Sequence, residues 1–132
     1  MVKQVLIAVI VILFFIIIIN LPFLGKIYPN IYIANLYVGD KDKTSAINLI
    51  SNTSIPSKIT LNIKGVEKEI LSSEIVKKID YEKSVNRAYT YTHTGNFVLD
   101  FYTKIKLIFK PLKAGLEIEF DQVKLEELLL IL

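Results

Sequence analysis

The chain contains no cysteine. This absence excludes disulfide bonds, thiolate metal sites and cysteine nucleophiles, and it also excludes the acylated cysteine of a lipoprotein. Exported bacterial proteins and cytosolic proteins can both lack cysteine, so the absence does not by itself assign a compartment.

The chain also has a single arginine, Arg87, and a single histidine, His93. The formal net charge is +3, yet lysines and acidic residues interleave without a block of like charge. Nucleic-acid-binding proteins carry clustered basic patches with several arginines, so we expect no nucleic-acid partner. A metal site or a Ser-His-Asp arrangement would depend on His93 alone, in an expected turn beside Gly95. The composition therefore predicts a protein that is not an enzyme and that holds no metal or cofactor.

A long apolar run occupies the amino terminus. Residues 5–19 are all apolar, and only Asn20 and Pro22 interrupt the continuation to residue 24. A transmembrane helix needs ~20 apolar residues to cross ~30 Å of hydrocarbon. Lys3 precedes the run and places the amino terminus in the cytoplasm. We therefore expect residues 1–25 to be a cell-membrane anchor, with residues 5–24 in the lipid bilayer, and residues 26–132 to form one extracytoplasmic domain.

Two other interpretations of this run stay open. A cleaved signal peptide has an apolar core of ~7–15 residues and a small-residue cleavage site, whereas Leu21, Phe23 and Leu24 are bulky. A buried core helix usually has a polar face, which residues 5–19 lack. The signal-peptide interpretation also exports residues 26–132.

The remaining chain alternates between strand and helix patterns. We expect strands at residues 31–38, 58–64, 66–71 and 116–120, with a tight reversal at residues 64–65 joining the second and third into a hairpin. We expect helices that begin at the caps Thr44, Asp80 and Asp121, and another from Phe97 to the residue before Pro111. Residues 72–79 are expected to be a connector with a helical turn at 74–78, and residues 52–54, a formal glycosylation acceptor, an ordinary loop. The expected fold class is α+β, a small, mainly antiparallel sheet packed with helices.

Periodicity predicts which side chains these elements bury. The predicted buried positions are Ala46, Ile47, Ile50, Tyr81, Val85, Ala88, Tyr89, Phe97, Phe101, Ile105, Ile108, Leu116, Ile118 and Phe120. Glu117 and Glu119 take the solvent side of the last strand, and we expect them to be solvated. The final helix ends on apolar residues 130–132 without a polar cap. Since an exposed apolar end favours association, we expect the chain to be truncated at its carboxy terminus.

Three segments carry a resemblance to a known family. They are residues 31–39 (IYIANLYVG) followed by Thr44-Ser45-Ala46, residues 79–89 (IDYEKSVNRAY), and residues 115–121 (GLEIEFD) with Lys124-Leu125. Their order and spacing resemble the peptidoglycan-binding domain that precedes the catalytic domain of certain L,D-transpeptidases and recurs in VanW-type vancomycin-resistance-associated proteins. Those proteins also begin with one membrane anchor.

The resemblance implies a bacterial, wall-associated module without catalysis, because transpeptidase chemistry belongs to a separate cysteine-bearing domain. It also implies a turn in which the family has Gly-Arg-x-Gly-Asn. Here Gly95 and Asn96 are kept, whereas His93 stands at the arginine position. Ser45 stands where the family usually has glutamate.

Tyrosines add candidate ligand contacts. An aromatic ring can cover the apolar face of a sugar while its hydroxyl keeps a polar contact. Tyr81 and Tyr89 are expected to fill the core, whereas Tyr91 and Tyr102 are candidates for such contacts. The candidate ligand-binding residues, including those from the turn of the resemblance, are Tyr91, His93, Asn96 and Tyr102.

The leading hypothesis is a membrane-anchored, non-catalytic module that binds or positions peptidoglycan or another wall polymer. The alternative is an extracytoplasmic protein-interaction or scaffold domain without glycan binding. It predicts that Leu125, Leu128 and Leu132 stay exposed for a protein partner. A concave groove lined by tyrosine would favour the first hypothesis, and a flat leucine patch would favour the second.

Overall fold

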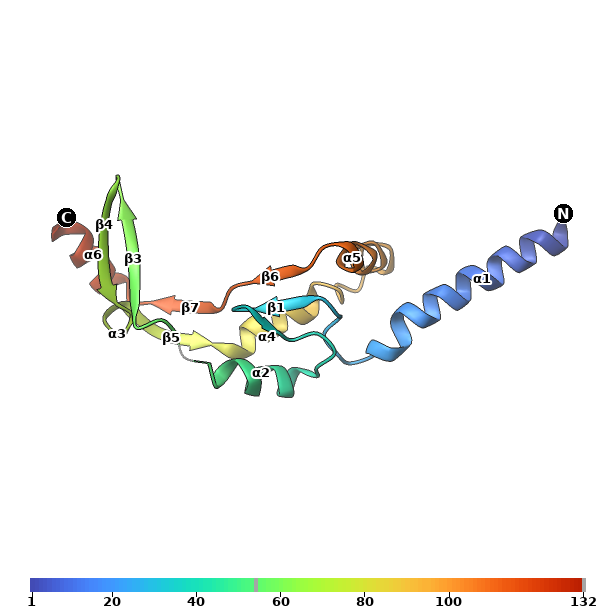
Figure 1. Cartoon of the computed structure of the whole chain (residues 1–132), viewed down its shortest axis with the longest axis horizontal. Helices are drawn as coiled ribbons and strands as arrows, with labels where there is room; N and C mark the ends of the chain where they lie inside the picture. Colours follow the sequence, from blue (N-terminus) through green and yellow to red (C-terminus); the bar gives the residue numbers. More distant parts are fainter. Residues whose placement is uncertain (54, 132) are drawn as a thin grey trace.

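The computed structural model describes residues 1–53 and 55–131. Ser54 of the expected loop and the expected exposed end at Leu132 lie outside the described residues. An apolar helix, α1 (Val2–Asn20), projects from one end of the chain, and the hairpin of β3 (Lys58–Ile63) and β4 (Val66–Leu71) stands at the other (Figure 1).

Helix α1 continues into a 3-10 turn, η1 (Leu21–Phe23). Together they form a candidate membrane span of 22 residues, Val2–Phe23, called the span below, with a mean hydropathy of 3.2 and only 6% of the apolar window buried. Among the described residues it is the one helix long and apolar enough to cross a membrane, although a signal sequence shares these properties. A buried core helix would be covered by the rest of the chain, whereas most of α1 is exposed.

A three-stranded sheet follows the span. It joins β2 (Leu36–Tyr37), β1 (Ile31–Ile33) and β6 (Leu112–Ala114) in that order. The prediction of one strand at residues 31–38 is wrong, because the chain reverses at Ala34 and Asn35 with φ of 49° and 64°. Two consecutive positive φ values match the tight turn of an antiparallel hairpin. β6, which pairs in parallel with β1, was not predicted.

Two further sheets have two strands each. β3 and β4 form the predicted hairpin, with Lys64 and Gly65 in the turn at φ of 51° and 85°. β5 (Val76–Asp80) pairs antiparallel with β7 (Glu117–Phe120). β5 replaces the second half of the expected connector at residues 72–79, and a short helix, α3 (Ser72–Ile75), replaces the first half. The fold is α+β with small, mostly antiparallel sheets, as expected, but the strands divide among three sheets instead of one.

The remaining helices are α2 (Lys43–Ser51), α3 (Ser72–Ile75), α4 (Tyr81–Thr90), α5 (Phe97–Phe109) and α6 (Gln122–Ile131). The predicted cap Asp80 accepts a hydrogen bond from Lys83 N, and Asp121 accepts one from Lys124 N. α2 is capped by Asp42 and not by Thr44. A carboxylate there satisfies an amide that has no partner within the helix.

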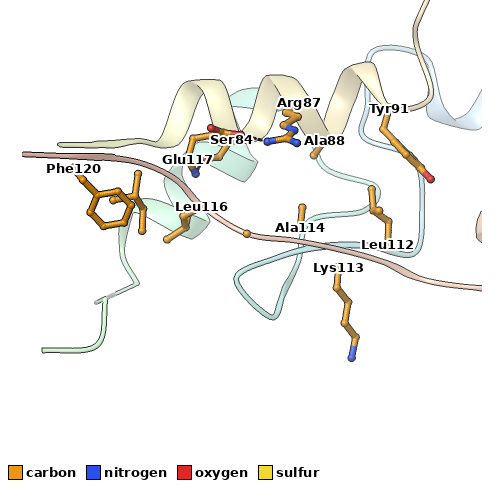
Figure 2. A pocket seen from close by; sticks show the side chains of 12 residues that line it. Ser84, Arg87, Ala88, Tyr91, Leu112, Lys113, Ala114, Leu116, Glu117 and Phe120 are labelled. Carbon is orange, nitrogen blue, oxygen red and sulfur yellow. Dashed lines mark hydrogen bonds and ion pairs between the residues drawn. The ribbon is translucent and has the colours of Figure 1, made fainter. Parts of the chain in front are cut away.

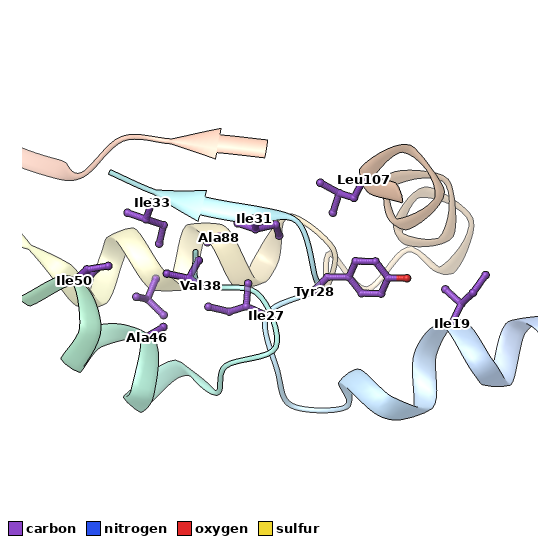
Figure 3. Close-up of a cluster of buried hydrophobic side chains, with 11 residues drawn as sticks. Ile19, Ile27, Tyr28, Ile31, Ile33, Val38, Ala46, Ile50, Ala88 and Leu107 are labelled. Carbon is purple, nitrogen blue, oxygen red and sulfur yellow. The ribbon is translucent and has the colours of Figure 1, made fainter. Parts of the chain in front are cut away.

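The main core lies where β1 packs against α2 and α4 (Figure 3). Its members are Ile19, Ile27, Tyr28, Ile31, Ile33, Val38, Ala46, Ile50, Val85, Ala88 and Leu107. The predicted buried faces of α2 and α4 are confirmed, with Tyr81 and Tyr89 packed against this core. The last turn of α1 joins the core through Ile19, which is 7% exposed.

The predicted buried face of α5 is confirmed for Phe101 and Ile105, which pack against the core, and it is wrong for Phe97 and Ile108. Phe97 and Ile108 are 62% and 57% exposed, whereas the helix buries Thr103, Lys104 and Leu107. Apolar residues cover so much of α5 that periodicity does not reveal which side meets the domain. Phe120, predicted to point inward from β7, is also exposed.

Candidate binding groove

An open groove of about 560 Å³ runs between α4 and the segment that contains β6 and β7 (Figure 2). Ser84, Arg87, Ala88 and Tyr91 line it from α4, and residues 112–118 and Phe120 line it from the strand segment. β6 pairs with β1, whereas β7 pairs with β5. The groove therefore lies where the extended segment changes its strand partner, and the backbone at Gly115 and Leu116 belongs to neither sheet.

Ser84 forms hydrogen bonds to both walls of the groove. Its hydroxyl donates a hydrogen bond to the Asp80 carbonyl at 2.7 Å and accepts one from the Glu117 amide at 2.9 Å. Ser84 is only 2% exposed, and a buried hydroxyl with both roles satisfied resists rearrangement. The first residue of β7 is thereby held against the first turns of α4.

An ion pair crosses the groove between the Arg87 guanidinium and the Glu117 carboxylate (Figure 2). The Arg87 side chain is 76% exposed, whereas that of Glu117 is 24% exposed. The prediction that Glu117 is simply solvated is therefore wrong, while Glu119 makes an exposed pair with Lys77. A guanidinium has five N–H donors, so Arg87 can serve Glu117 and an anionic ligand together.

Tyr91 stands at the carboxy-terminal end of α4 and is 36% exposed. It lines the groove and also a smaller cavity of about 230 Å³ formed with Lys106, Leu107, Lys110, Pro111 and Leu112. Arg87 and Tyr91 are four residues apart, which places them on one face of the helix. This wall of the groove thus offers a cation beside an aromatic ring.

The other predicted ligand-binding residues do not line this groove. The His93 ring stacks on the Tyr89 ring, with 4.1 Å between the ring centroids, and His93 Nδ1 lies 2.9 Å from the Tyr89 carbonyl oxygen. The Asn96 side chain caps α5 by accepting a hydrogen bond from Leu99 N. Tyr102 is 64% exposed on α5. Of the four predicted residues, Tyr91 alone lies in the groove.

Sequence reasoning did not select Arg87, Lys113 or Glu117. A signal for Arg87 is present, because the only arginine of the chain stands one helical turn before a candidate tyrosine. No local signal places Glu117 opposite Arg87, because 30 residues separate them. Among the described residues, no group of three or more histidine, aspartate or glutamate side chains could hold a metal ion.

A second feature joins the span to the domain. Lys104 Nζ of α5 donates a hydrogen bond to Asn20 Oδ1 at the end of α1, and lies 5.7 Å from the centroid of the Tyr28 ring. Burial lowers the pKa of the Lys104 ammonium below its usual value, and the Asp100 carboxylate partly opposes this shift. The Lys104 residue as a whole is 8% exposed, and a buried charge needs a partner to be stable. Asn20 is thus a fixed contact between α1 and α5.

Comparison of the chain with protein-family models, curated proteins and solved structures gives no match in any of the three.

Proposed function

We propose that this protein is a membrane-anchored, non-catalytic module that binds peptidoglycan, or a similar wall polymer, in the groove between α4 and residues 112–120. In this proposal α1 spans the cell membrane with its amino terminus in the cytoplasm, and residues 26–132 form an extracytoplasmic domain. The observation that carries the proposal is that Arg87 and Tyr91 line the same wall of an open groove.

The chemistry of the groove fits a glycan that carries carboxylates. Peptidoglycan contains N-acetylated sugars and peptide carboxylates. The Tyr91 ring can cover the apolar face of a sugar, and Arg87 can hold a carboxylate with two parallel hydrogen bonds. The volume of about 560 Å³ lies within the ~300–1,000 Å³ typical of ligand sites. The open shape suits a polymer that continues beyond the site at both ends.

The span supports this function by tethering. An anchored module meets wall polymer at the high local concentration set by its short connection to the membrane, so that weak affinity is sufficient for retention. The module would hold the polymer near the membrane for a separate enzyme.

Sedimentation with purified peptidoglycan tests the proposal. The full chain in detergent micelles should pellet with insoluble peptidoglycan, whereas an unrelated single-span protein should not. Loss of one aromatic contact worth about 0.5–1.5 kcal/mol weakens binding about two- to tenfold, which is the expected effect of Tyr91→Ala. Tyr102→Ala is the matched control, because it removes an exposed tyrosine outside the groove.

The proposal is wrong if the wild-type chain does not pellet above the control protein. An equal loss of binding in Tyr91→Ala and Tyr102→Ala would place the contact outside the groove. Arg87→Ala should weaken binding as well, and the effect should diminish at high salt because an exposed ion pair is screened.

The second candidate function is a protein-interaction or scaffold domain, which the exposed face of α6 favours. Leu130 and Ile131 are 87% and 75% exposed, and Val123 is 66% exposed. Leu125 and Leu128, expected to be exposed, are half-buried, so the apolar patch differs from the predicted one. If a Leu130→Ser variant loses an extracytoplasmic protein partner while the wild-type chain fails to bind peptidoglycan, this second function is the correct one.

A further inference from the structure

Helix α5 exposes much of an apolar face, on which only Phe101 and Ile105 are partly buried against the core. Five large side chains on it are at least half exposed: Phe97 at 62%, Val98 at 76%, Tyr102 at 64%, Ile108 at 57% and Phe109 at 83%. With 3.6 residues per turn, these five positions fall within about 140° of the helix circumference. The opposite side of α5 meets the domain through Thr103, Lys104 and Leu107. A surface helix with its apolar side outward is the reverse of the usual arrangement.

The position of α5 relative to α1 indicates what covers this face. The Lys104–Asn20 hydrogen bond joins α5 directly to the end of the span. Figure 3 shows Tyr28 between Leu107 of α5 and Ile19 of α1, so the two helices are packed through one layer of side chains. Helix α5 therefore lies next to the level at which α1 would leave the hydrocarbon.

The direction of α5 matches a membrane surface. In Figure 1 α5 is seen nearly end-on, while α1 runs across the view. α5 therefore crosses α1 steeply, and if α1 spans a bilayer, α5 runs along the bilayer surface. A helix in this position buries its apolar face ~5–10 Å into the boundary between headgroups and acyl chains.

The charges on α5 suit the same surface. Lys106 and Lys110 are exposed beside the apolar face. Asp100, the single acidic residue of α5, is engaged, because its carboxylate accepts hydrogen bonds from Thr94 N at 2.9 Å and from Thr94 Oγ1 at 2.6 Å. Lysines beside apolar side chains are typical of helices that bind anionic lipid surfaces.

We propose that α5 is an interfacial helix whose apolar face inserts into the same bilayer that α1 spans. This inference rests on the part of the proposed function that places α1 in a membrane, and it is independent of what the groove binds. The domain is then held to the membrane at two points. A domain fixed in this way presents its groove to the wall in one orientation instead of swinging on a single connection.

Tryptophan fluorescence tests the inference, because the chain has no tryptophan of its own. Single-tryptophan variants of the full chain are reconstituted in phosphatidylcholine–phosphatidylglycerol vesicles, with and without bromine on the acyl chains. Val98→Trp and Phe109→Trp report on α5. Val123→Trp is the matched control, since Val123 is a valine of similar exposure on α6, at the far end of the molecule from α1 (Figure 1). Phe14→Trp is the reference within the span.

We expect brominated lipid to quench emission from positions 98 and 109, as it quenches position 14, and to leave position 123 unchanged. The emission maximum at 98 and 109 should shift to shorter wavelength on reconstitution. Quenching at 14 together with solvent-like emission at 98 and 109 would overturn the inference and leave the anchor intact. Absence of quenching at 14 would instead refute the anchor, and with it both proposals.

Coverage of α5 by a second copy of the chain has its own signature. The emission would shift to shorter wavelength without quenching by brominated lipid, and the shift would fade as the protein is diluted in excess lipid. This result would also overturn the inference.

Discussion

Substitution of Gly39 by alanine should destabilise the domain through a steric conflict at one position. A Cβ atom on Gly39 would lie 2.6 Å from Tyr37 Oη, 2.7 Å from Tyr37 Cζ and 2.9 Å from Pro29 Cα. Contacts below 3.0 Å require movement of one partner, and the Pro29 backbone is held because the neighbouring Asn30 carbonyl accepts a hydrogen bond from Leu112 N. The Tyr37 ring must therefore move, and the backbone at residue 39 must also shift slightly away from Pro29 Cα.

Displacement of the Tyr37 ring removes two interactions. Its hydroxyl donates a hydrogen bond to Asp40 Oδ2 at 2.9 Å, and its ring packs edge-to-face on Tyr32 with 5.3 Å between centroids. A hydrogen bond contributes about 0.5–1.5 kcal/mol, and an aromatic pair contributes a similar amount. Their loss costs about 1–3 kcal/mol, which the lower entropy of the unfolded chain offsets by about 0.4–1 kcal/mol. We expect Gly39→Ala to lower the free energy of unfolding by about 0.5–2 kcal/mol.

The assay is urea unfolding of the full chain in detergent micelles, followed by far-ultraviolet circular dichroism. Gly115→Ala is the control, because no atom lies within 4 Å of its added Cβ and its φ is outside the left-handed region. The penalty of Gly39→Ala should be smaller in a Tyr37→Ala background, where the ring is already absent. The reasoning fails if Gly39→Ala and Gly115→Ala have equal stability, or if the penalty does not depend on Tyr37.

Two further predictions concern the junction and the cap of α2. Asn20→Leu removes the acceptor of the buried Lys104 ammonium and should lower the free energy of unfolding by about 1.5–3 kcal/mol. Lys104→Met should lower it less, because this variant leaves no buried charge. Urea unfolding of both variants checks which one is the less stable. Hydrogen bonds from Ser45 N and Oγ lower the pKa of Asp42, so its contribution to stability is complete above the unfolded pKa and is lost as the pH falls through the lower folded value. Asp42→Asn keeps a capping side chain without this titration. The difference in melting temperature between the wild-type chain and Asp42→Asn should therefore be smaller at acid pH than at neutral pH.

Local features of the structure could be predicted where a few adjacent residues specify them. The span follows from uninterrupted apolar composition, which needs no knowledge of partners. The turn at Lys64 and Gly65 follows from the readiness of glycine to adopt positive φ. The turn at Ala34 and Asn35 was missed, because alanine rarely adopts a φ of 49° and gives no signal of a reversal.

In the groove, too, local features could be predicted and long-range contacts could not. One wall is local, since the spacing of Arg87 and Tyr91 on a helix is visible in the sequence. The opposite wall exists because β6 pairs with β1 and β7 pairs with β5, contacts between segments far apart in the chain. His93 and Asn96 were predicted to bind ligand from a turn. In the structure the His93 ring stacks on the Tyr89 ring, and the Asn96 side chain caps α5.

The sequence alone determined the apolar span, the helix caps Asp80 and Asp121, and the paired strands β3 and β4, because dihedral preference, capping and periodicity act over a few residues. Only the tertiary structure decided which side of α5 is covered and which residues face one another across the groove. The physical reason is that burial depends on the elements that pack nearby. For α5 these come from the span and from residues 28–30, more than sixty positions earlier in the chain.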